Sequence, residues 1–226
     1  KEAEIEHWTT EDKKAALKEN EQERISLSKK AIPLLKKALE IHPLSNVAWL
    51  QMAKAQHFLG QVEDLPPNVN LTYLYTALAA YDLAYHYRAV GMDTTINNFK
   101  AICLMDLGKL MGQKFGDNAA AISLLEKAKV ANPENAEIYL LLGTVYSMLK
   151  DYDKTIENCL QSLALRPTDR DTKQNLAVAY QQYAFANTSK RNLLPLAEKL
   201  LLEVYQVEKK LADNEVTKRD ALIRTL

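Results

Sequence analysis

Apolar residues recur along most of this chain with the period of an α-helix. Tyr139, Leu142, Gly143 and Tyr146 follow one another at intervals of three, one and three residues, which places them on one helical face. The chain has only six Gly and seven Pro in 226 residues, so long stretches run without a helix breaker. Clusters of β-branched residues, which are typical of strands, are missing. The pattern predicts an all-α protein.

Two turn signals show that the helical pattern is repeated. Pro133 and Pro167 are 34 residues apart, and two amphipathic segments lie between them. The second segment carries a small, a large and another small residue at intervals of four and three. Small residues at both ends of two helical turns allow a neighbouring helix to approach closely. The same pattern recurs along the chain as Ala31-Leu35-Ala38, Ala77-Tyr81-Ala84, Ala121-Leu125-Ala128, Thr155-Cys159-Ser162 and, loosely, Ala197-Leu201-Val204. Five copies predict an internal repeat.

The helices follow from this periodicity and from capping signals. Asn135, Thr168 or Asp169, and Asn192 are predicted N-caps, and Pro195 a first-turn residue. Pro33 is expected to kink or restart its helix. The predicted helices are a lead helix over 11–30 running into one that ends before Pro43, pairs at 45–59 with 71–90, 94–112 with 118–131, 135–149 with 152–165 and 169–186 with 193–212, and a short cap at 216–225.

These residues resemble the tetratricopeptide repeat, a 34-residue helix–turn–helix unit. Its first helix (helix A) carries an aromatic residue, Leu, Gly and Tyr, and its second (helix B) carries Ala, a large apolar residue, Ala and Pro. The match is close over 136–169, although Thr155 and Ser162 replace Ala and Cys159 replaces the large residue. The resemblance covers about 31–207 and fades toward both ends, where terminal repeats must present a polar face to water.

The resemblance implies a right-handed superhelical solenoid of antiparallel helix pairs, with four to five repeats and capping helices. The expected organisation is a lead or capping helix at 1–30, a repeat domain at 31–207 and a C-terminal capping helix at 208–226. The repeats are placed near 46–93, 101–135, 136–169 and 170–207.

Composition and motifs narrow the range of functions. The 29 Lys and Arg balance 29 Asp and Glu, and no dense basic run is present, which argues against binding of nucleic acid. The sequence has no run of about 18 apolar residues, the length that a membrane-spanning helix needs, so we expect no insertion into a membrane. No motif of a catalytic, phosphate-binding or metal site is found, so we expect no enzyme activity, no cofactor and no metal. Cys103 and Cys159 lie in apolar helical patterns and are expected to be buried thiols.

The expected partner is a protein or peptide bound on the concave face. In the family, side chains on helix A line this groove. The positions carried over to this chain include Leu50, Lys54, His57, Leu140, Thr144 and Val178, where we expect the site. Leu50, Leu140 and Val178 are apolar where a solvated helix face would carry charge. The Lys and Asn that clamp a C-terminal carboxylate in one subfamily are absent at the matching positions. Tyr73 and Tyr75 are placed at the groove rim, because exposed Tyr is a favoured interface residue. The inserted segment 61–72 adjoins this face and is expected to contribute to function.

Two other functions fit the same sequence. The chain could be the soluble repeat region of a larger exported or membrane-anchored assembly protein, or an accessory domain of an enzyme whose catalytic part lies elsewhere. The start at Lys1 suggests a processed or excised chain. The compartment, cytoplasmic or extracytoplasmic, and the oligomeric state do not follow from the sequence.

Overall fold

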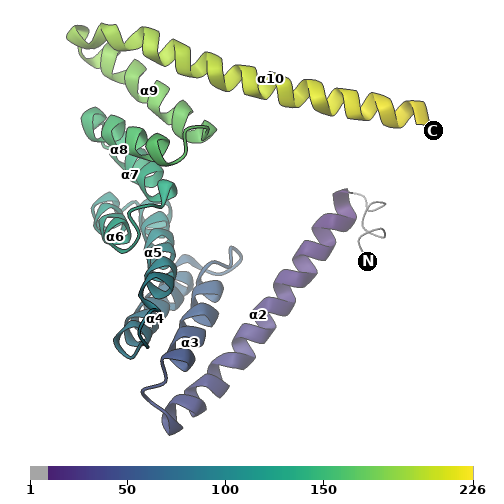
Figure 1. The fold of residues 1–226 in the computed structure, drawn as a ribbon, viewed down its shortest axis with the longest axis vertical. Helices are drawn as coiled ribbons and strands as arrows, with labels where there is room; N and C mark the ends of the chain where they lie inside the picture. The colour runs from purple at the N-terminus through teal and green to yellow at the C-terminus, as the bar shows by residue number, and fades with distance from the viewer. Residues whose placement is uncertain (1–9, 226) are drawn as a thin grey trace. The chain divides into compact units, whose positions relative to one another are not determined.

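A computed structural model describes the backbone of residues 10–225 and the side chains of residues 17–210. These residues form helices and turns, and no strand occurs among them. Figure 1 shows the helices in chain order. The chain forms two compact units, Lys1–Asp117 and Asn118–Leu226. The predicted all-α fold is confirmed.

The first unit is built from four helices and a π-helical turn within residues 10–117. They are α2 (Thr10–Ile41), α3 (Asn46–Gly60), α4 (Pro67–His86), α5 (Asp93–Leu110) and the π-helical turn η1 (Met111–Phe115). The helix α3 packs against α2 on one side and α4 on the other, and α4 also packs against α5.

Local signals set the ends of these helices. The Ser45 hydroxyl accepts a hydrogen bond from the backbone N–H of Ala48 at 3.3 Å and caps α3. Pro67 is the first residue of α4. Proline is tolerated there because a backbone N–H at this position would have no acceptor within the helix. Gly116 follows the π-helical turn with φ of 69°, a left-handed conformation that favours glycine. The insertion predicted at 61–72 therefore becomes a short loop and the first turns of α4.

The helix α2 is continuous through Pro33, so the helix does not restart at this proline. Pro33 removes one backbone donor, but the turns on both sides continue the helix. One face of α2 also carries Ile25, Ile32, Leu35 and Leu39, which are half-buried or buried at helical spacing. Because α2 packs along α3, we attribute the continuous helix to this burial.

The core of the first unit consists of large side chains that contact no water. They are Leu59, Leu74, Tyr81, Ile96 and Leu107. Tyr81 thus occupies the core position that the repeat pattern predicts. Its ring stacks on that of Phe99, with 6.2 Å between the centroids.

The second unit continues the alternation of helices. It contains α6 (Asn118–Ala131), α7 (Ala136–Met148), α8 (Tyr152–Leu165), α9 (Arg170–Ala186), the 3-10 turn η2 (Thr188–Leu193) and α10 (Leu194–Thr225). Asn135 and Asp169 cap α7 and α9 as predicted, through side-chain oxygens that accept from the N–H groups of Glu137 and Thr172. Asn192 was predicted to cap the last helix but lies inside η2, and α10 begins two residues later.

The last helix also differs from the prediction. The sequence predicts one helix ending near residue 212 and a short cap at 216–225, whereas α10 is continuous to Thr225. Asp and Asn at 213 and 214 are weak helix formers, but two such residues cost little within a long helix.

Gly143 lies at a close contact between α7 and α8. A Cβ atom on Gly143 would lie 3.0 Å from the Cys159 sulfur and 3.4 Å from the Thr155 carbonyl oxygen. The repeat pattern predicts this close approach. Cys159 continues into a core cluster with Leu176, Ala177, Tyr180 and Ala197. Both cysteines are buried free thiols, as expected.

Candidate binding site

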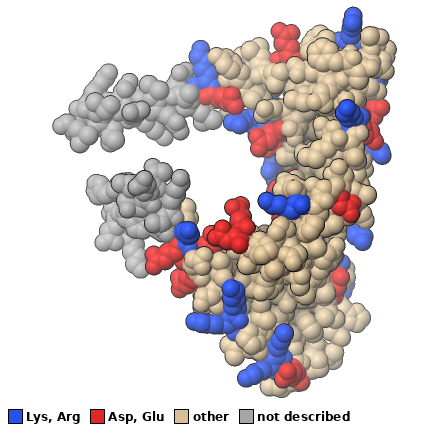
Figure 2. Space-filling model, turned by 180° about the vertical axis from the view of Figure 1, so that it is seen from behind, with Lys and Arg blue, Asp and Glu red and all other residues tan. Residues whose placement is uncertain are grey.

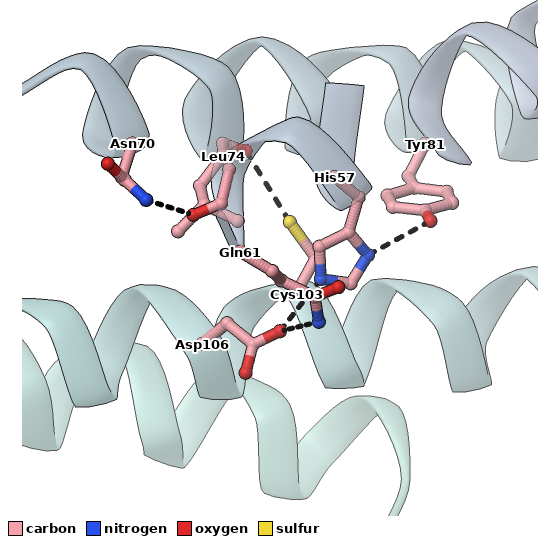
Figure 3. Close-up of polar contacts among 8 residues, drawn as sticks. His57, Gln61, Asn70, Leu74, Tyr81, Cys103 and Asp106 are labelled. Atoms are coloured by element: carbon pink, nitrogen blue, oxygen red, sulfur yellow. Dashed lines mark hydrogen bonds and ion pairs between the residues drawn. The ribbon is translucent and has the colours of Figure 1, made fainter. Parts of the chain in front are cut away.

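A buried polar network joins α3, α4 and α5 in the first unit (Figure 3). His57 of α3 is 6 % exposed. Its Nδ1 lies 3.2 Å from the Tyr81 hydroxyl, and its Nε2 lies 2.9 Å from Oδ2 of Asp106 on α5. Gln61 donates a second hydrogen bond to the same carboxylate oxygen at 2.7 Å. The network therefore ties three helices together at the end of α3.

Burial keeps the Tyr81 hydroxyl of this network protonated. Burial raises the pKa of Tyr81 well above its usual range, and Cys103 and Asp106 raise it further. The Tyr81 hydroxyl therefore stays protonated, and each nitrogen of the His57 ring has a partner within hydrogen-bond distance, Nδ1 the Tyr81 hydroxyl and Nε2 the Asp106 carboxyl group. Both ring nitrogens are then occupied, and the histidine acts as a structural link.

A cleft of about 740 Å³ opens beside this network. One wall is the loop after α3 and the start of α4, and the other is the end of α5 with the π-helical turn. The first wall contributes Gln61, Glu63, Asp64, Leu65, Pro67, Asn70 and Leu74, and the second contributes Asp106, Lys109, Leu110, Gln113 and Lys114. The lining is mixed, with both signs of charge and several apolar side chains.

Asn70 holds the first wall in place. Its amide Nδ2 donates to the backbone carbonyls of Gly60 at 2.9 Å and Val62 at 2.7 Å. These bonds fold the loop back onto α4. The side chain is 7 % exposed, and its Oδ1 atom is buried without a hydrogen-bond partner.

The predicted binding residues of the first unit have different environments. Leu50 and His57 are both 6 % exposed, so the expectation that they face an open groove is wrong. Lys54 is half-buried and its Nζ lies 4.2 Å from the centroid of the Phe99 ring. Tyr73 is half-buried, and Tyr75 is 46 % exposed. Neither tyrosine is among the residues that line the cleft.

The reason for the error lies in how α3 is packed. Helix α3 contacts α2 and α4, and through His57 and Lys54 it also contacts α5. A helix with neighbours on three sides has little surface left for a ligand.

The predicted residues of the second unit remain more accessible. Leu140 and Thr144 on α7 are half-buried, and Val178 on α9 is 37 % exposed. The Thr144 hydroxyl donates to the Leu140 carbonyl at 2.9 Å and accepts from the Asn175 amide at 3.2 Å. Since Asn175 and Val178 are three residues apart on one helix, the structure brings these predicted side chains onto adjacent faces.

Asp106 and Asn70 were not predicted as site residues from the sequence. Asp106 could have been recognised from the sequence, because it is an acidic residue within the apolar run Ile102 to Leu107. Such a residue must find a partner when the run is buried. Asn70 had no comparable signal, because its role depends on the path of the inserted loop.

The described surface was examined for a charged patch, a membrane-spanning helix and a metal site. The face drawn in Figure 2 carries Lys and Arg side chains interspersed with Asp and Glu, with no basic patch continuous across it. Among the described residues, no helix is both long and apolar enough to cross a membrane. No group of three or more His, Cys, Asp or Glu within that part of the chain could hold a metal ion.

Comparison with known proteins identifies the repeat. The sequence model of the tetratricopeptide repeat matches residues 136–169, the segment with the closest pattern. No curated protein matches the chain significantly.

Several solved structures share the fold. A crystal structure of MamA is 23 % identical with a TM-score of 0.54, covering 92 % of this chain and 99 % of that one. A second MamA structure is 22 % identical with a TM-score of 0.52, covering 86 % and 95 %. A fragment of MamA from Desulfovibrio magneticus RS-1 is 18 % identical with a TM-score of 0.50, covering 88 % and 97 %. The chain thus contains a tetratricopeptide repeat at residues 136–169, and it shares the all-α fold of these structures.

Proposed function

We propose that the chain is a scaffold that binds a partner protein, and that a peptide segment of the partner lies in the cleft of the first unit. The observation that carries the proposal is the cleft itself, with its two walls of mixed polarity. Concave sites at the edge of a rigid helical framework are common binding sites. The repeat fold supports the scaffold role, since stacked repeats leave surfaces that the core does not need.

The lining favours an extended peptide as the ligand. Glu63 and Asp64 on one wall and Lys114 on the other are exposed and can pair with charged side chains of either sign. Leu65 and Leu110 are half-buried and offer apolar contact between the charges. A peptide with a few apolar anchors among polar residues fits such a lining.

A second contact surface in the proposal is the α7–α9 face of the second unit. It contains Leu140, Thr144 and Val178, as the repeat resemblance implies. Lys54, Tyr73 and Tyr75 remain proposed contacts in the first unit. Leu50 and His57 are left out, because their side chains are buried.

The test compares partner capture by charge variants. The purified chain is used as bait in a lysate of its source, and captured proteins are identified by mass spectrometry. We expect the variant Asp64→Lys with Lys114→Glu to lose the partner, because it inverts charge on both walls of the cleft. The matched control is Glu134→Lys with Lys127→Glu, two exposed residues of the second unit that are outside the cleft.

The candidate peptide is then measured by calorimetry with the same variants. Equal affinity for parent, cleft variant and control would show that the cleft does not bind the peptide. Weaker affinity in the cleft variant alone, with unchanged circular dichroism, would support the proposal.

A further inference from the structure

The helix α2 carries an apolar stripe on a face that the first unit does not cover. Leu27, Leu34 and Ile41 recur every seven residues and are 56 %, 66 % and 72 % exposed. Ala38, which is exposed, and Ala31, which is half-buried, lie between them. We call these five residues the outer stripe. Apolar residues at this spacing form a seam along one side of a helix.

A different face of α2 is already used for packing. The half-buried or buried positions Ile25, Ile32, Leu35 and Leu39 form that face, and α2 packs along α3. The outer stripe is rotated away from this face, and in the repeat pattern Ala31-Leu35-Ala38 marks a helix B. A helix B is normally packed between two neighbouring helices, whereas α3 is the main neighbour of α2 in the first unit.

The length of α2 leaves still more of it uncovered. Its 32 residues span about 48 Å, whereas the 15 residues of α3 span about 22 Å. Figure 1 shows α2 running on past the end of α3. All side chains from Leu17 to Arg24 are exposed. An isolated helical segment of this kind is marginal in water and gains stability from packing.

We propose that the outer stripe packs against residues 17–31 of the α2 helix of a second copy of the chain, with the two helices antiparallel. With the two-fold axis near Lys29, Leu17 lies opposite Ile41 of the second copy, and Leu27 opposite its Ala31. Leu27 thus faces a small residue, and Leu34 lies opposite Arg24 of the second copy, whose aliphatic stem can cover it. The self-complementary contact is the one that a two-fold dimer requires.

The charges beside the stripe select the antiparallel arrangement. Glu23, Lys30 and Lys37 are exposed and flank the stripe on one side at seven-residue spacing. In the antiparallel pair, Glu23 of each copy faces Lys37 of the other, so the attraction occurs twice. Lys30 faces itself near the axis, where its long side chain can extend into water. A parallel pair would place Glu23 near Ser28 and lose both ion pairs.

Sedimentation equilibrium of the full chain tests the proposal, which does not depend on the proposed peptide site. We expect a mass twice the 25.6 kDa of one chain. The variant Leu27→Lys with Leu34→Lys should sediment as a monomer with unchanged circular dichroism. The control Val130→Lys with Phe185→Lys, two exposed apolar residues of the second unit, should remain a dimer. A monomeric parent chain would overturn the proposal.

Charge reversal tests the pairing. Glu23→Lys should weaken the dimer, and combining it with Lys37→Glu should restore it, because the two ion pairs reform with opposite sign. A dimer that is equally tight in Glu23→Lys would contradict the pairing.

Engineered cysteines test the direction. Leu17→Cys mixed with Ile41→Cys should give an oxidised heterodimer, because those residues are opposite each other. In the antiparallel pair, Leu17 lies about 36 Å from Leu17 of the second copy. Rapid crosslinking of Leu17→Cys to itself would therefore show a parallel dimer and overturn the proposal.

Discussion

At the scale of single residues, His57 shows how a contact between distant segments decides the role of a side chain. The sequence predicts that His57 projects from its helix toward a groove, whereas the side chain is buried. Asp106 lies 49 residues further on and meets it there, so the ring is enclosed by its partners. The register between α3 and α5 depends on the inserted loop and on α4, which periodicity alone does not define. The burial of His57 therefore could not be predicted from the sequence, whereas the core position of Tyr81 could be predicted from the repeat pattern.

The first prediction concerns Asp106. Asp106→Ala removes the hydrogen-bond partner of Nε2 of His57 and of the Gln61 amide, and leaves a buried polar atom without a partner. We expect the free energy of unfolding to fall by about 1–3 kcal/mol, measured by urea denaturation. The control is Asp82→Ala, which breaks a more exposed ion pair with Lys100 and should cost less than about 1 kcal/mol. Equal losses in the two variants would show that the network adds nothing beyond a surface pair.

The second prediction is a loss of stability at alkaline pH. Burial raises the pKa of the Cys159 thiol from 9.0 to about 12, because the thiolate is poorly solvated in the core. The unfolded chain therefore releases this proton at a lower pH than the folded chain. Its contribution to stability is complete below pH 9 and is lost as pH rises toward 12.

Cys159→Ala tests this linkage. The free energy of unfolding should fall less between pH 9 and pH 11 in this variant than in the parent chain. Cys103 and Tyr81 also have raised pKa values, so the variant should keep part of the slope. An unchanged slope would show that Cys159 does not titrate on unfolding.

At the scale of helices, the predicted helix limits are most accurate where capping residues and the repeat pattern coincide. The predicted segments 135–149 and 152–165 agree closely with α7 and α8, which begin after Asn135 and Asp151. Predictions fail at the two longest helices, where charged residues recur without a strong stop signal. Pro33 was expected to kink or restart its helix, and a boundary was expected between residues 212 and 216, but α2 and α10 are continuous there.

The third prediction tests the close approach of α7 and α8. Gly143→Leu should overpack the contact with Cys159 and Thr155 and lower stability by about 1–3 kcal/mol or more, measured as a shift of the thermal midpoint. Gly143→Ala adds only the Cβ atom and should cost less than Leu. Gln161→Leu, at an exposed position of α8, serves as the control and should change the midpoint little. A midpoint equal to that of the parent in Gly143→Leu would contradict the register of the repeat.

The fourth prediction concerns Pro33. Its side chain is exposed, so Pro33→Ala removes no core contact. Alanine restores a backbone donor inside α2 and should raise the free energy of unfolding by about 1–3 kcal/mol. The control is Pro195→Ala in the first turn of α10, where proline is well tolerated and the change should be small. Lower stability in Pro33→Ala would indicate that the proline serves the packing of α2.

At the scale of the whole molecule, the chain consists of two units that each have a core. Leu59, Leu74 and Leu107 belong to the first core, and Cys159 and Leu176 to the second. The division at Asp117 falls between the two helices of the repeat predicted at 101–135. Periodicity predicts repeats but not which helices share a compact unit, since that depends on the sum of their contacts. The predicted domain limits at 31 and 207 remain predictions.

The fifth prediction follows from these separate cores. A fragment of residues 118–226 contains the helix pair α7–α8 and the pair α9–α10 together with the core cluster around Cys159. Stability in repeat proteins is approximately the sum of repeat and neighbour terms, so a fragment that keeps several neighbours can fold alone. We expect a helical circular dichroism spectrum and a cooperative thermal transition at a lower midpoint than that of the full chain. Leu176→Ala in the same fragment should abolish the transition, because it empties a buried site at a cost of about 2–5 kcal/mol. A fragment that is unfolded before any substitution would show that the second core forms only in the presence of residues 1–117.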